Sequence, residues 1–169
     1  TPGTAQDNYS LLSAAIACGD PVIYMEHKEL WGLEGEVLES EQVVLGKARV
    51  LRSGTDVTLV TWSRTVQAAT VAAEAAAKNG ISVELIDLRT IWPWDRETVL
   101  SSAGKTKRLV VAHEAVRAAG FGAEIAATVA EELGVPVKRV GGPRIPVGYS
   151  RPLEDEARVS VEAIMRALG

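Results

Sequence analysis

The sequence predicts an α/β domain, a three-layer sandwich around a mostly parallel sheet of about five strands. From residue 47 onward, apolar runs typical of strands alternate with helical segments. These runs are apolar at almost every position, which is typical of strands covered on both faces. Most successive runs are separated by a helical segment, as parallel strands with right-handed crossovers require.

Local signals place the elements of this domain. The expected strands are 48–51, 57–61, 81–86, 108–112 and 137–140, and the expected helices are 65–78, 96–102, one opened by Gly120 and Gly122 that reaches Leu133, and a final helix. The final helix carries apolar residues at 161, 164, 165 and 168, the spacing of one helical face. Strand 48–51 comes too soon before the next for a helical crossover, so we expect it at an edge and antiparallel. Residues 143–157 are expected to form a loop punctuated by prolines.

The first 46 residues do not follow this pattern. Asp7 is expected to cap a helix that ends at Gly19, and residues 21–25 are expected to form a short strand. Residues 26–46 hold six glutamates and three glycines with little periodicity, which indicates an extended acidic connector. We therefore expect three parts: a helix and strand over 1–25, the connector over 26–46, and the main domain over 47–169.

Composition excludes several classes of protein. The chain has 169 residues and a net charge of −4, so it has no overall basic footprint for nucleic acid. The single cysteine, Cys18, cannot form an internal disulfide and is expected to pack as a small apolar residue. No apolar run approaches the ~20 residues of a membrane span, and residues 1–10 do not read as a signal peptide. Because Thr1 opens what reads as a mid-chain loop, we expect a fragment or a processed chain.

The candidate site lies at the carboxyl ends of the strands, where α/β sheets bind ligands. His113 and Glu114 follow the third core run and pair a group that titrates near neutrality with a carboxylate. Gly120 and Gly122 could bring backbone N–H groups to an anion, and Arg144 follows the last strand. The structural alternative is a histidine bonded to a loop carbonyl, a glutamate in a salt bridge, and glycines in a tight turn.

Two further features follow the second core run. Asp87 and Arg89 are expected to form a salt bridge that fixes the loop. Trp92 and Trp94 flank Pro93, and they anchor either an interface or the core. The sequence shows no cluster of cysteine and histidine metal ligands, no nucleophile elbow and no phosphate-binding P-loop.

A colinear series of stretches from about residue 5 to the end resembles one family. The stretches are Asp20–Ile23 with Glu26–Lys28, Gly54–Val60, Glu84–Ile91, His113–Ala115 with Gly120–Ile125, and Pro146–Val147 with Pro152–Asp155. They are similar to the beta subunits of the thiamine-diphosphate-dependent 2-oxoacid dehydrogenases. Residues 89–95 look closer to the branched-chain members than to the pyruvate members. Transketolase and deoxyxylulose-phosphate synthase share the C-terminal fold but match the connector and residues 113–124 less well.

The resemblance implies an architecture and a division of labour. Residues 1–25 resemble the end of a pyrimidine-binding domain, and residues 47–169 resemble a transketolase C-terminal-like domain. The complete enzyme uses thiamine diphosphate and magnesium for oxidative decarboxylation of a 2-oxoacid, with acyl transfer to a lipoyl group. The family's activating glutamate lies upstream of these residues and the metal site on the alpha subunit. No catalytic, cofactor-binding or metal-binding residue is therefore carried over, and the chain alone is expected to be inactive.

The resemblance also implies partners. These are the alpha subunit, a second beta subunit, and the small basic subunit-binding domain of the lipoyl acyltransferase, with Glu154, Asp155 and Glu156 as candidate contacts. Neither nucleic acid nor a membrane is expected, and the location is the cytoplasm, or the mitochondrial matrix in a eukaryote.

Two other functions stay open. The first is a stand-alone module that binds a small anionic effector at the loops of His113, Gly120 and Arg144. The second is an oligomerisation domain that buries Trp92, Trp94 and the last helix between copies.

Overall fold

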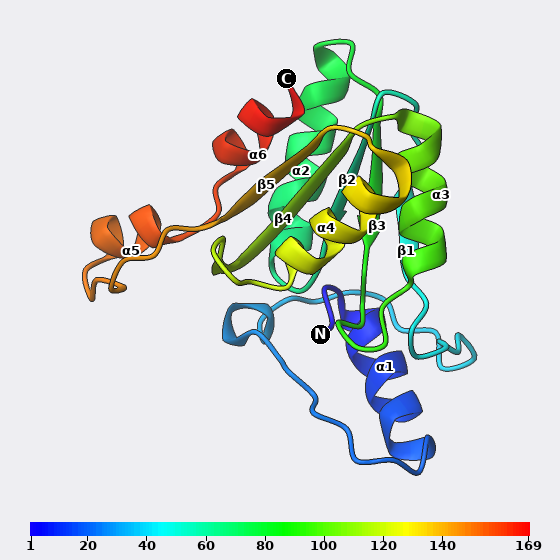
Figure 1. Ribbon diagram of the computed structural model, residues 1–169. Helices are drawn as coiled ribbons and strands as arrows, with labels where there is room; N and C mark the ends of the chain where they lie inside the picture. The colour runs from blue at the N-terminus through cyan, green and yellow to red at the C-terminus, as the bar shows by residue number, and fades with distance from the viewer.

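A five-stranded sheet forms the centre of the computed structural model, which describes residues 1–169 (Figure 1). Its strands are β1 (Arg49–Arg52), β2 (Val57–Thr61), β3 (Val83–Asp87), β4 (Leu109–Val116) and β5 (Val137–Gly142). They lie in the order β1-β3-β2-β4-β5. β1 pairs with β3 in the antiparallel sense, and the other three pairs are parallel. The predicted fold class and the antiparallel edge strand are both confirmed.

Helices cover both faces of the sheet and complete the three layers. α2 (Thr65–Lys78) and α6 (Val161–Leu168) lie on one face, and α3 (Arg96–Thr106) and α4 (Gly122–Leu133) lie on the other (Figure 1). Two separate apolar cores result, one with Ala69 and Ile164 between sheet and helices, the other with Val99 and Ile125. All residues of β2 and β3 are buried, as expected for strands covered on both faces, and these include the polar residues Thr58, Thr61, Glu84 and Asp87. No helix is long and apolar enough to cross a membrane.

β4 and α3 extend further than the local sequence signals suggest. β4 continues past the expected end at 112 because it pairs with β5 as far as Val116 and Gly142. His113 and Glu114 therefore lie within a strand and alternate between its two sides, instead of following it in a loop. The positions of the two side chains in the candidate site follow from this alternation.

α1 (Ala5–Ala17) begins earlier than predicted. Thr4, not Asp7, is its N-cap, and the Thr4 hydroxyl accepts a hydrogen bond from the backbone N–H of Asp7 at 3.0 Å. Asp7 stands in the first turn, where its negative charge favours the helix N-terminus. The predicted N-cap was wrong because Thr4, three residues earlier, caps the helix, and its hydroxyl also donates a hydrogen bond to Oδ2 of Asp7 at 3.0 Å.

The strand predicted over residues 21–25 is absent. This segment has irregular structure and no neighbouring strand to complete its hydrogen bonds, and Ile23 is 87% exposed. Residues 26–46 form no strand and contain the short 3₁₀ helix η1 (Lys28–Leu30) and turns at 31–32, 39–40 and 45–46.

The predicted loop over 143–157 contains a helix. α5 (Arg151–Ala157) starts with Pro152 in its first turn, a position where proline's missing N–H costs no hydrogen bond. The prolines of this segment therefore do not exclude a helix. The segment projects from the body of the molecule (Figure 1).

Candidate functional site

His113 lies in the interior, near the carboxyl end of β4. Its side chain is fully buried, and its ring stacks on that of Trp62, which follows β2, with centroids 5.1 Å apart and planes 15° from parallel. The ring of Phe121 meets that of Trp62 edge-on, with the ring centroids 6.2 Å apart. The aromatic rings close this part of the strand-end region to solvent.

Two glycines complete the enclosure of the histidine. A Cβ atom at Gly122 would lie 2.5 Å from Cδ2 and Nε2 of His113, and one at Gly120 would lie 2.6 Å from Cε1. Any larger residue would displace the ring. The structure thus brings His113 and Gly120 together. The glycines lie in a tight turn packed on the histidine, as the structural alternative expected.

The ring nitrogens of His113 have no hydrogen-bond partner. Burial lowers the pKa of the imidazole below its ordinary value, so the ring is neutral at pH 7. A neutral ring shielded on both faces has no path for exchanging a proton with a bound substrate. The backbone of Ala115 acts on the ring in the opposite direction and raises its pKa, but by less than burial lowers it.

Glu114 points to the opposite side and joins an ion-pair cluster. Its carboxylate lies 2.8 Å from Nε2 of His27 in the connector and accepts a hydrogen bond at 3.0 Å from Nη1 of Arg64, which precedes α2. The connector is thereby fixed to the main domain near the strand ends. Sequence reasoning missed this use of His27, because residues 27 and 114 are distant in sequence.

The ion-pair cluster continues to the last part of the chain. Glu29 of the connector pairs with both Arg64 and Arg158, and Arg158 also pairs with Glu154 at 2.9 Å. Burial raises the pKa of Glu29, but hydrogen bonds and charges of the two arginines outweigh it and hold that pKa below its ordinary value. The connector, α2, β4 and α5 therefore share one electrostatic network.

Arg144 stands apart from the other predicted site residues. It is exposed on the projecting segment and forms no ion pair. Of the docking candidates, Asp155 and Glu156 are exposed, whereas Glu154 is partly buried against Arg158.

A second buried polar group lies at the carboxyl end of β3. The guanidinium of Arg89 lies 2.7 Å from Asp7 of α1, and the backbone N–H of Arg89 donates to Oδ1 of Asp87 at 3.0 Å. The predicted Asp87–Arg89 salt bridge was wrong, because the arginine reaches across to α1 instead. Burial, together with the charge of Asp7, raises the pKa of Asp87 to about 7.

The two tryptophans beside Pro93 differ in their burial. Trp94 packs against the core and meets Phe121 edge-on at 6.3 Å. Trp92 is 79% exposed. The core and interface alternatives therefore apply to different members of the pair.

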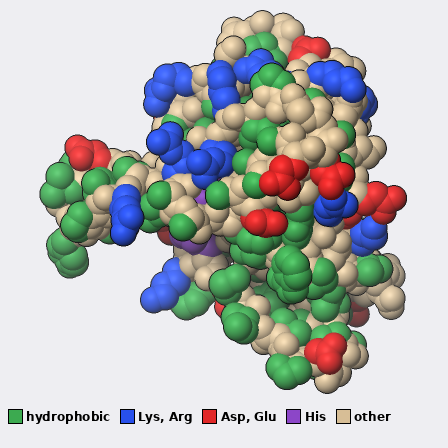
Figure 2. All heavy atoms as spheres, viewed as in Figure 1, with side chains coloured by type: hydrophobic (Ala, Val, Ile, Leu, Met, Phe, Trp, Pro, Cys, Tyr) green, Lys and Arg blue, Asp and Glu red, His purple; other side chains and the backbone are tan.

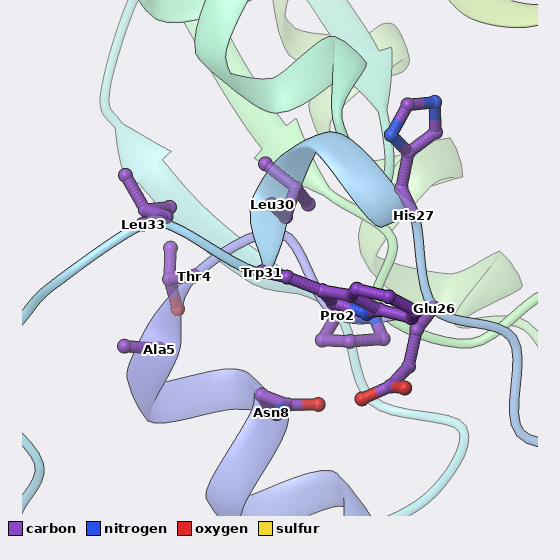
Figure 3. Close-up of a pocket in the computed structure, with 9 residues that line it drawn as sticks. All are labelled: Pro2, Thr4, Ala5, Asn8, Glu26, His27, Leu30, Trp31 and Leu33. Atoms are coloured by element: carbon purple, nitrogen blue, oxygen red, sulfur yellow. The ribbon is translucent and has the colours of Figure 1, made fainter.

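A hollow of about 240 Å³ lies between the start of α1 and the connector (Figure 3). Its lining residues come from these two segments, and they are Pro2, Thr4, Ala5, Asn8, Glu26, His27, Leu30, Trp31 and Leu33. The lining combines apolar side chains with the polar groups of Asn8 and Glu26. None of the predicted site residues lines it.

Comparison with known proteins gives the class of this fold and site. Residues 46–164 match the family model described as the transketolase C-terminal domain, and the chain belongs to that family. A split-gene transketolase of solved structure, an inactive beta4 tetramer, superposes with a TM-score of 0.78 over 99% of this chain and 54% of its own; at 22% identity it shows the fold alone.

Curated proteins similar to this chain include beta subunits of several oxidoreductases. The chain is 41% identical, over 98% of its length, to the mitochondrial pyruvate dehydrogenase E1 component subunit beta of Dictyostelium discoideum, covering 49% of it. It is 38% identical, over 99% of its length, to the 2-oxoisovalerate dehydrogenase subunit beta of Bacillus subtilis, covering 54%. A beta subunit of acetoin:2,6-dichlorophenolindophenol oxidoreductase from Cupriavidus necator is 43% identical over 91% of the chain, which covers 47% of that relative. The chain spans about half the length of these relatives.

Proposed function

We propose that this chain acts as the C-terminal part of a 2-oxoacid dehydrogenase beta subunit, serving subunit assembly and docking of the acyltransferase core. The observation that supports this most is its similarity, over nearly its whole length, to beta subunits of both pyruvate and branched-chain enzymes. The complete assembly, with an alpha subunit and a second beta subunit, would decarboxylate a 2-oxoacid and acylate a lipoyl group.

In this proposal, the three parts of the chain keep separate roles. Residues 1–25 belong to the pyrimidine-binding part, residues 26–46 connect, and residues 47–169 form the assembly domain. The Asp7–Arg89 contact supports a fixed junction between the first and third parts, because both side chains are buried. The location is the cytoplasm or the mitochondrial matrix.

The chemistry of decarboxylation is assigned to other parts of the assembly. Thiamine diphosphate is held through a metal ion and a diphosphate, and no group of three or more His, Cys, Asp or Glu side chains is placed to hold a metal here. The family resemblance places the metal and diphosphate site on the alpha subunit, so no catalytic step is routed through the residues of this chain. The enclosure of His113 and the separation of Arg144 also give no support to the effector-binding alternative.

Sequence identity to the relatives does not distinguish which 2-oxoacid is the substrate. A 2-oxoisovalerate dehydrogenase beta subunit from Chaetomium thermophilum is 46% identical over 80% of this chain, against 41–43% for the pyruvate dehydrogenase relatives over almost all of it. We therefore propose that the substrate belongs to one class of compounds, which includes both pyruvate and the branched-chain 2-oxoacids.

Docking is assigned to the acidic side of α5. Asp155 and Glu156 are exposed there, and Glu154 lies beside them. A basic subunit-binding domain would gain favourable charge contacts with this helix. Binding can be measured by titration calorimetry with the isolated subunit-binding domain of the same organism's acyltransferase.

The test is to reverse all three charges to lysine. We expect at least a tenfold loss of affinity, because three attractive contacts become repulsive. A matched control reverses Glu34, Glu36 and Glu39, which are exposed in the connector and form no ion pair. Unchanged affinity in the α5 variant, with unchanged far-ultraviolet circular dichroism, would remove the docking role from this helix.

A further inference from the structure

We propose that His27 is a proton-dependent switch: its neutral ring caps η1 and fixes the connector to the main domain, and its protonated ring gives up that cap. The switch operates within this chain, so it does not depend on the proposed function. His27 stands directly before η1, and Figure 3 shows its ring directed away from the start of α1. Histidine is the side chain whose charge ordinarily changes between about pH 5 and 8.

Each ring nitrogen of His27 has one polar partner. Nδ1 accepts a hydrogen bond from the backbone N–H of Glu29 at 3.2 Å, which makes His27 the N-cap of η1. Nε2 lies 2.8 Å from Oε2 of Glu114 on β4. The other carboxylate oxygen of Glu114 accepts a hydrogen bond from Nη1 of Arg64 at 3.0 Å, which fixes the carboxylate beside the ring. The imidazole therefore connects the first turn of η1 to the main domain.

The two partners of the ring require one protonation state. A neutral imidazole has one N–H donor and one nitrogen that accepts. Because Nδ1 accepts from Glu29, the proton of the neutral ring is on Nε2, where it is donated to Glu114. A second proton would be on Nδ1, which would then face the N–H of Glu29 as donor against donor. Protonation therefore strengthens the contact with Glu114 and abolishes the cap.

Loss of the cap acts on the ion-pair cluster. η1 is a single turn, Lys28–Leu30, and none of its residues is buried, so little packing holds it in place. Glu29 in this turn pairs with Arg64 before α2 and with Arg158 after α5. The cap thus helps to position the carboxylate that joins these three segments. We expect protonation of His27 to weaken both pairs of Glu29 and to loosen the connector from the main domain.

Charged groups face His27 from each segment packed against it. They are Glu114 of β4, Arg64 before α2, Lys28 and Glu29 of η1, Arg158 after α5 with its partner Glu154, and Glu26 beside His27 in the chain. Carboxyl, guanidinium and ammonium groups ordinarily titrate outside pH 5–8. Burial alone would raise the pKa of Glu29, but the hydrogen bonds and charges of the two arginines hold it below its ordinary value, so this carboxylate stays charged. Histidine is therefore the residue type in this set that operates the switch.

The experiment follows the chain by nuclear magnetic resonance from pH 8 to pH 5. Long-range nitrogen–proton spectra distinguish the two neutral tautomers of a histidine from its protonated form. We expect the Nε2–H tautomer of His27 at pH 8. As the ring becomes protonated, the amide resonance of Glu29 is expected to shift with the same midpoint. Its protection against solvent exchange, corrected for the intrinsic rate at each pH, is expected to fall at least threefold.

Two variants and one internal control accompany this titration. His27→Asn supplies a side-chain oxygen that caps a helix and does not titrate, so the amide of Glu29 is expected to keep its hydrogen bond throughout. Glu114→Gln keeps the cap and removes the charge that favours the protonated ring, so release of the cap is expected at a lower pH. His113, the other histidine of the chain, is fully buried elsewhere, and its titration is expected to leave the amide of Glu29 unchanged.

Three results would overturn the inference. The first is an Nδ1–H tautomer of His27 at pH 8, since that ring could not cap η1. The second is an amide of Glu29 that does not follow protonation of His27. The third is the same change in His27→Asn, which would assign it to a carboxyl group of the cluster. If far-ultraviolet circular dichroism shows that His27→Asn does not fold, the tautomer of the unsubstituted chain and the shift in Glu114→Gln decide the matter.

Discussion

The packing around His113 depends on two neighbouring glycines, which have no side chain to fill the space beside its ring. Gly120 and Gly122 allow the α4 turn to lie against the imidazole, and Trp62 stacks on its face. A sequence shows a histidine, a carboxylate and two glycines, but it does not show which of them face one another. The strand period places His113 inside and Glu114 in the ion-pair cluster, so two adjacent residues have unrelated roles.

The first prediction concerns the space beside the ring. Gly122→Ala is expected to lower the free energy of unfolding by about 2 kcal/mol, because the new methyl group overlaps His113. Gly104→Ala in α3 is the matched control, since its Cβ would meet only one atom, at 3.9 Å. Because Gly104 lies in a helix interior, replacing it with alanine is expected to raise the free energy of unfolding by roughly 0.5–1 kcal/mol. Urea unfolding followed by tryptophan fluorescence measures both, and equal effects of the two substitutions would contradict the packing described.

The second prediction concerns pH and Asp87. Its pKa rises from 3.8 in the unfolded chain to about 7 in the folded protein, so between these values the folded state binds more protons. Stability from this group is therefore present below pH 4 and is lost as pH rises to about 7. Asp87→Asn removes the buried charge and is expected to stabilise the protein at pH 8 by on the order of 2 kcal/mol, and much less at pH 4.

The measurement is thermal unfolding of both proteins across this range. Burial lowers the pKa of His113, so that group contributes the opposite slope, with stability lost as pH falls below about 6.5. The effect of Asp87 is therefore obtained from the difference between variant and unsubstituted chain at each pH. A difference that does not grow between pH 4 and pH 8 would show that Asp87 titrates normally.

At the scale of elements, regular local patterns predicted well and long-range contacts did not. α2 occupies the predicted range of 65–78, because its alanine-rich helix and the following Asn79-Gly80 stop are local signals. The strand expected at 21–25 needs a neighbouring strand, and its apolar residues alone do not provide one. The Arg89–Asp7 contact joins residues 82 positions apart, so spacing in the sequence favoured the nearer Asp87 instead.

The third prediction compares two isoleucines on different elements. Ile164 of α6 is fully buried, whereas Ile145, in the projecting segment before α5, is 46% exposed and outside both cores. Ile164→Ala is expected to destabilise the chain by about 2–5 kcal/mol, because it leaves a cavity between α6 and the sheet. Ile145→Ala is expected to change stability by less than about 0.5 kcal/mol. Chemical unfolding measures both, and a comparable loss in Ile145→Ala would mean that the projecting segment is part of the folding core.

For the whole molecule, the fold class was predictable because alternating elements and buried strands leave few arrangements. The candidate site was less predictable. His113 and Gly120 do meet, but Arg144 lies on the projecting segment, whose helix α5 was missed because its prolines are typical loop signals. The resulting molecule has a closed strand-end region near His113 and a projecting segment, residues 143–157, that carries both acidic and exposed apolar side chains.

We propose that this chain supplies assembly and docking and that other parts of the assembly carry out the decarboxylation. The most direct measurement is carbon dioxide release by the purified chain alone, given thiamine diphosphate, magnesium and either pyruvate or a branched-chain 2-oxoacid. The account predicts release equal to that of a protein-free blank. Sustained release above the blank, in proportion to protein concentration, would contradict it.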